Sequence, residues 1–140
     1  MKTFNQLHEA FSNPYSWKWT SKDDERWIAN FPEVKGQAEV HLIDNDLVGY
    51  TFEIDGSMGV TGKGDGFRIF ATAIEILVDY IRKEKPKQIN FSAEKYNFAA
   101  KKKTNRNRLY TRMIKKYVPK EYKLNMTNTE YDTIFHLKRK

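Results

Sequence analysis

The sequence has no cysteine and only three histidines, and each scarcity excludes a class of protein. Without cysteine, a chain of 140 residues cannot be a disulfide-stabilised scaffold, bind zinc through thiolates or use a thiol nucleophile. His8, His41 and His136 lie far apart and lack carboxylates at the spacing of a metal site, so we expect no metal. The absence of cysteine fits a reducing compartment, and we expect a cytoplasmic protein.

Long apolar runs are also absent. The longest, residues 67–81, is interrupted by Arg68, Glu75 and Asp79, and it falls short of the roughly 20 apolar residues that span a bilayer. Residues 1–11 carry charges and no apolar centre, so we expect no signal peptide and no membrane partner. Aromatic residues make up 14% of the chain, which favours one folded domain, residues 1–140, over disorder.

Charge is distributed unevenly along the chain. Residues 1–94 hold 11 Lys or Arg and 15 Asp or Glu, whereas residues 95–140 hold 14 and 3, so that the formal net charge of +7 is the balance of an acidic and a basic part. Such a split predicts a polyanionic partner for the basic part, and a solvated basic face is the alternative.

Hydrophobic periodicity predicts helices and strands in a definite order. The expected elements are a helix at 3–11, strands at 15–20, 25–31, 37–43 and 46–54, a helix at 65–83, a strand at 88–93, a helix at 104–117, and strands at 121–126 and 130–138. A strand–helix–strand unit implies a parallel crossover. We therefore expect an α/β (α+β) domain whose mixed, mostly antiparallel sheet contains one central crossover, with residues 1–54 forming its first part and 55–140 its second.

A glycine-rich loop connects the fourth predicted strand to the longest predicted helix. Residues 55–66 contain five glycines, and a loop of this kind before a helix N-terminus is typical of an anion site. The loop is not a P-loop, because Ser57 stands at the first glycine position, nor a dinucleotide fingerprint, because Phe67 stands at the last. A loop without a ligand is the alternative.

The basic segment 95–123 holds eleven Lys or Arg and one acid, interleaved with aromatic residues. That combination suits nucleic acid, through phosphate charge and base stacking, and an acidic protein would also fit. The residues we expect to bind nucleic acid or another anion are Lys101, Lys102, Lys103, Arg106, Arg108 and Arg112. A solvated helix face is again the alternative.

The segment from Phe52 to Phe135 resembles the cofactor half of the GNAT superfamily of acyl-CoA-dependent N-acetyltransferases. Gly62-Lys63-Gly64 matches the glycine positions of the family's pyrophosphate loop, and Gly59 stands where the family has Arg or Gln. Leu109-Tyr110, preceded by two asparagines, matches the later helix of the family. The strand 88–93 and this helix are also similar to segments of small uncharacterised phage proteins, so the resemblance implies a phage protein acting in a bacterial host.

The resemblance implies that acetyl-CoA is bound and assigns a role to several residues. Backbone N–H groups of Gly62, Gly64 and Gly66 would hold the pyrophosphate, assisted by Lys63 and Arg68, and Lys101, Lys102, Lys103 and Arg106 would receive the 3′-phosphate. Tyr110 would be the general acid and Glu53 the general base. Tyr110 in the core and Glu53 as an ordinary strand residue are the alternatives.

Whether the chain is an enzyme stays open at this stage. The competing hypotheses are a basic interaction module without catalysis and an assembly component of a virion. The sequence does not indicate the acyl acceptor or the oligomeric state.

Overall fold

The computed structural model describes residues 14–54, 66–94, 96–97, 102–103, 106–130 and 132–140, leaving out the side chains of residues 66–67, 93–94, 96–97, 102–103, 106–110 and 132. The elements are β1 (Lys18–Lys22), β2 (Arg26–Phe31), the 3-10 turn η1 (Pro32–Val34), β3 (Gly36–Asp44), β4 (Leu47–Ile54), α2 (Gly66–Glu84), β5 (Gln88–Glu94), β6 (Tyr96–Asn97), β7 (Lys102–Lys103), α3 (Arg106–Tyr117), β8 (Tyr122–Asn128) and β9 (Asp132–Arg139). The predicted helix at 3–11 and the glycine loop at 55–65 lie outside the described residues.

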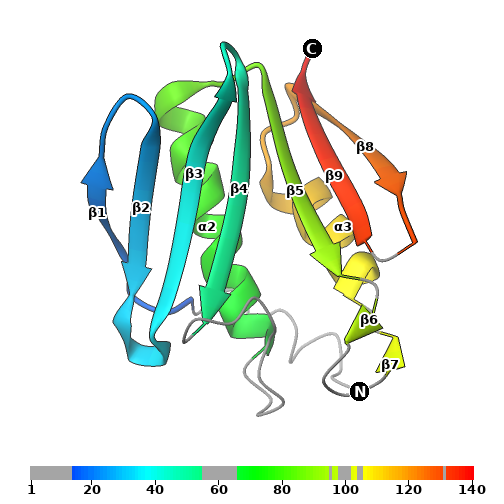
Figure 1. Ribbon diagram of the computed structural model, residues 1–140, viewed down its shortest axis with the longest axis horizontal. Helices are drawn as coiled ribbons and strands as arrows, with labels where there is room; N and C mark the ends of the chain where they lie inside the picture. Colours follow the sequence, from blue (N-terminus) through cyan, green and yellow to red (C-terminus); the bar gives the residue numbers. More distant parts are fainter. Residues whose placement is uncertain (1–13, 55–65, 95, 98–101, 104–105, 131) are drawn as a thin grey trace.

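One sheet organises the molecule, and the two described helices lie on the same face of it (Figure 1). Its seven strands follow the order β1-β2-β3-β4-β5-β9-β8. Every neighbouring pair is antiparallel except β4 and β5, which run parallel and are joined by α2. The structure thus confirms the predicted fold class, an α+β domain whose mostly antiparallel mixed sheet has one central crossover.

The central helix α2 is buried on more than one side. Ile74, Leu77 and Ile81, which share one face of the helix, are buried, and so are Ile69 and Ile76, which lie outside that face. Because α2 is covered on several sides, its sequence is almost entirely apolar between the charged residues. It ends where Lys85 adopts a positive φ of 46° and donates its N–H to the carbonyl of Ile81 at 2.9 Å.

Two predictions on local structure need correction. The first strand begins at Lys18 and not at Tyr15, because Tyr15 is buried against α2, where its backbone N–H donates to Oγ1 of Thr72 at 2.8 Å. The segment between the predicted strand at 88–93 and the predicted helix at 104–117, for which no strand was expected, contains the short antiparallel pair β6 and β7.

Side chains alternate between the helix-covered face of the sheet and the open one. On β4, Val48, Tyr50 and Ile54 are buried. Thr51 and Glu53 are half-buried on the opposite face. Gly49 marks a close approach, since a Cβ there would lie 2.6 Å from the His41 ring. The pairing of β3 with β4 shifts its register between Leu42 and Asp44.

Candidate functional site

The parallel strands β4 and β5 pair only at their amino ends. The register joins Leu47 to Gln88, Val48 to Ile89 and Gly49 to Asn90, and no later pair of the two strands is found. β4 nevertheless continues to Ile54 and β5 to Glu94. The two ribbons separate toward their carboxyl ends, the end at which α2 begins (Figure 1).

Two aromatic rings occupy the helix side of the sheet where this pairing stops. Tyr50 and Phe91 are the next residues after the last pair, both are buried, and their rings meet edge-to-face with centroids 6.4 Å apart. The Tyr50 hydroxyl donates to the carbonyl of Ala73 on α2, and burial raises the pKa of Tyr50 well above its ordinary value. Phe91 in turn stacks on Phe135 at 4.9 Å. Tyr50 is therefore tied to α2 by its hydroxyl, and its ring packs beside Phe91 on the helix side of the sheet where the β4–β5 pairing stops.

Glu53 lies on the part of β4 that has no β5 partner. It is half-buried on the open face and lines a hollow of about 160 Å³ together with Gln37, Glu39, Thr51 and Phe52. Glu53 thus occupies a position within β4, with its side chain on the open face. Its role as a base remains a prediction.

Arg68 lies in the first part of α2 and contacts two other segments. Its Nη2 atom is 3.9 Å from Oε2 of Glu33, and its guanidinium lies over the Tyr15 ring, 3.9 Å from the centroid. The side chain keeps 34% of its surface exposed. These contacts hold the positive charge beside the N-terminus of the helix, where an anion is favoured.

The remaining predicted site residues are only partly within the described structure. Gly66 begins α2, Lys102 and Lys103 form β7, and Arg106, Arg108 and Tyr110 belong to the first half of α3, whose side chains are outside the description. Arg112 is exposed on α3. Gly62, Lys63, Gly64 and Lys101 lie outside the described residues. The choice between a catalytic and a core Tyr110 therefore stays a prediction.

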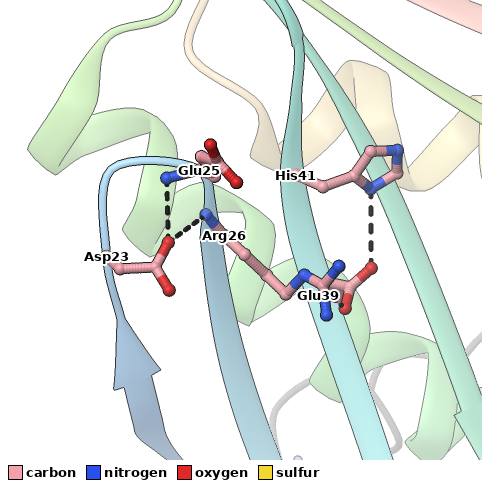
Figure 2. Close-up of polar contacts among 5 residues, drawn as sticks. All are labelled: Asp23, Glu25, Arg26, Glu39 and His41. Carbon is pink, nitrogen blue, oxygen red and sulfur yellow. Dashed lines mark hydrogen bonds and ion pairs between the residues drawn. The ribbon is translucent and has the colours of Figure 1, made fainter.

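A polar cluster on the open face was not predicted as a unit. Figure 2 shows Glu39 between Arg26 and His41, with Arg26 Nε at 3.3 Å from one carboxylate oxygen and His41 Nδ1 at 3.7 Å from the other. Asp23 orders the preceding turn by accepting the backbone N–H groups of Glu25 and Arg26, both at 2.8 Å. The alternation of Glu39 and His41 was visible in the sequence, but Arg26 joins them only through the β2–β3 register.

Among the described residues, no group of three or more His, Asp or Glu side chains could hold a metal ion. Neither helix in the described part of the chain combines the length and the apolar character that a membrane crossing requires.

The sequence matches no protein-family model, and no curated protein matches it. The similar solved structures include two that we describe here. A domain from Methanocaldococcus jannaschii DSM 2661 is 12% identical, with a TM-score of 0.45, over 98% of this chain and 94% of that one. The crystal structure of a probable acetyltransferase is 12% identical, with a TM-score of 0.41, over 80% of this chain and 58% of that one.

Proposed function

We propose that this protein is a GNAT-like N-acyltransferase that binds acetyl-CoA in the opening between β4 and β5. The observation that carries the proposal is the early end of β4–β5 pairing, after which residues 50–54 of β4 have no strand partner on that side within the described part of the chain. In open sheets, ligands bind outside the carboxyl ends of parallel strands. The residues that resemble the GNAT pyrophosphate loop precede α2, which begins at this same end.

The cofactor's two ends would meet different parts of the chain. Backbone N–H groups of Gly62, Gly64 and Gly66, at the positive end of the α2 dipole, would bind the pyrophosphate, with Lys63 and Arg68 adding charge. Lys101, Lys102, Lys103 and Arg106 would receive the 3′-phosphate. The thioester would then lie along β4, where a free backbone N–H polarises its carbonyl.

In the proposed reaction the acceptor amine attacks the thioester carbonyl, a carbon–nitrogen bond forms, and the carbon–sulfur bond breaks. Glu53, acting through water, takes the proton that the amine loses. Tyr110 donates a proton to the departing thiolate. A phage origin stays a prediction from the sequence resemblance.

Calorimetric titration of acetyl-CoA into the protein and into Gly64→Val tests this function. We expect micromolar binding by the parent chain and a loss of at least about tenfold in the variant, because a side chain would keep the phosphate from the backbone. Gly56→Val is the matched control, since it makes the same change in the same loop outside the Gly62–Gly64 motif. No binding by the parent chain, or equal loss in both variants, would contradict the proposal.

The role of Tyr110 needs a separate variant. Tyr110→Phe keeps the ring and removes the proton, so we expect turnover of acetyl-CoA with an amine acceptor to fall about a hundredfold while the affinity for acetyl-CoA stays unchanged. Unchanged turnover with a lower melting temperature would identify a core tyrosine.

A further inference from the structure

A hollow with an apolar floor and a basic rim lies at the end of the molecule opposite the β4–β5 opening. Its volume is about 330 Å³, and it lies between the last turn of α3, the turn to β8, and the outer strands. Ile114, Val118 and Leu137 are buried residues that supply the apolar surface, and Leu124 contributes from β8. The hollow is formed entirely by residues within the described structure.

Three lysines surround this floor. Lys115 comes from α3, Lys120 from the turn after it, and Lys140 follows β9, and all three are exposed. Among the described residues, none of their ammonium groups lies within ion-pair distance of a carboxylate, although Glu121 is next to Lys120 in the chain. Unpaired cations around apolar surface favour a ligand that carries both apolar groups and negative charge.

The surrounding surface is basic as well. Lys116 is exposed on the neighbouring part of α3, and Lys123 and Lys138 are exposed on the other face of the strands β8 and β9. Positive charge thus continues around the edge of the sheet, which suits an extended partner better than a small anion.

The aromatic residue of the hollow argues against nucleic acid. Tyr122 is buried, and its hydroxyl donates to the carbonyl of Pro86 at 2.6 Å, so its ring is not presented for base stacking. The rim consists of lysines, which lack the planar fork with which arginine recognises phosphate. β8 is the last strand in the sheet order, so its outer edge offers backbone groups to a peptide.

From these observations we propose that the hollow formed by α3, β8 and β9 is a docking site for an acidic peptide segment of a partner protein. Leucine or phenylalanine side chains of the partner enter the apolar floor, and its flanking carboxylates pair with Lys115, Lys120 and Lys140. The proposal is independent of acyl transfer, because it uses neither the glycine loop nor the β4–β5 opening.

The test is fluorescence anisotropy with a labelled peptide of repeated Glu-Glu-Leu-Phe units. We expect the double variant Lys115→Glu/Lys120→Glu to bind this peptide at least about tenfold more weakly, because two attractions become two repulsions. Lys18→Glu/Lys35→Glu is the matched control, with the same change of charge at exposed positions on other elements. Melting curves of both variants show whether each is folded.

Two further probes separate the alternatives. A peptide with serine in place of Leu and Phe is expected to lose most of its affinity, because serine side chains bury little apolar surface against the floor of the hollow. A single-stranded oligonucleotide is expected to compete weakly at physiological salt. Equal binding by the serine peptide, an unaffected Lys115→Glu/Lys120→Glu variant, or full displacement by the oligonucleotide would overturn the proposal.

Discussion

Two glycines of the sheet differ in how well each position can accommodate an added side chain. A Cβ on Gly36 would lie 2.0 Å from Cε2 of Phe31, and Phe31 is completely buried, so its ring has no room to move. A Cβ on Gly49 would meet the His41 ring at 2.6 Å, but that side chain is 37% exposed and can rotate into solvent. The same close approach therefore has different consequences in the core and on the open face.

We accordingly expect Gly36→Ala to lower the free energy of unfolding by about 3 kcal/mol, the upper range for an overpacked core. Gly49→Ala is the paired control, for which we expect a loss below about 1 kcal/mol, because the half-exposed His41 ring can move away from the new methyl group. Urea unfolding of both variants provides the measurement. Similar losses for the two variants would show that Phe31 can move aside.

Some residues were predictable from sequence because their position follows from alternation alone. Glu53 and His41 were expected within the strands 46–54 and 37–43, and the structure places them on β4 and β3 with half-buried side chains. Tyr15 was assigned to a strand because it alternates with Trp17, yet it packs on α2 through a contact 57 residues away in the chain. Hydrophobic periodicity predicts which side of a segment is buried, but it does not predict which other element covers that side.

At the scale of elements, aromatic contacts, a hydrogen bond and an ion pair connect the hairpin of β1 and β2 to α2. Trp19 Nε1 donates to Oδ2 of Asp79 at 2.8 Å, and Lys83 Nζ lies 2.8 Å from the same oxygen. The rings of Trp19 and Trp27 meet edge-to-face at 5.1 Å, and Trp27 meets Tyr80 at 5.0 Å. One carboxylate thus joins the edge strand β1 to the central helix.

Asp79→Asn is expected to weaken this junction. Partial burial acts to raise the pKa of Asp79, but the hydrogen bonds from Lys83 and Trp19 and the nearby positive charges outweigh it, so that the pKa lies below its ordinary value. A lowered pKa in the folded state stabilises the fold above the unfolded-state pKa of about 3.9, and this contribution disappears as the pH falls through the folded-state pKa.

At neutral pH we therefore expect Asp79→Asn to reduce the free energy of unfolding by about 1 kcal/mol, the usual net value of such a hydrogen bond. The difference from the parent chain should vanish at a pH below the folded-state pKa of Asp79. Chemical denaturation across this pH range measures it. Glu75→Gln is the control, an exposed carboxylate on α2 without an ion pair among the described residues. An Asp79→Asn loss that does not vary with pH would contradict this account.

The elements themselves were largely predictable, whereas their pairing was not. Residues 46–54 and 88–93 were recognised as strands with a helix between them, which implied a parallel crossover. That their pairing stops after Gly49 and Asn90 depends on contacts between segments about 40 residues apart and on the rings of Tyr50 and Phe91. The candidate opening is therefore a tertiary feature without a local sequence signal.

At the scale of the whole molecule, the direction of α3 separates basic positions that lie close together in the sequence. The segment 95–123 was predicted as a single basic region, but within it α3 runs from the carboxyl end of β5 toward the opposite end of the sheet (Figure 1). Arg106 and Arg108 belong to the beginning of the helix, whereas Lys115 belongs to its last turn. The net charge of a segment could not reveal this division, because it depends on how the helix crosses the sheet.

The two ends should bind independently. A helix with the 12 residues of α3 is roughly 18 Å long, which exceeds the screening length of about 8 Å at physiological salt. We expect Lys115→Glu/Lys120→Glu to leave the Kd for acetyl-CoA within about twofold of the parent value, as for distant independent sites. We expect Gly64→Val, correspondingly, to leave binding of the acidic peptide unchanged.

Calorimetry with each ligand in the presence of the other measures any coupling directly. If the two sites are independent, saturating peptide leaves the affinity for acetyl-CoA unaltered. Thermodynamic linkage then requires that saturating acetyl-CoA leaves the affinity for the peptide unaltered. A reciprocal change in the two affinities would show that α3, the element shared by both ends, transmits binding from one to the other, and the docking site would then regulate the proposed acyl transfer.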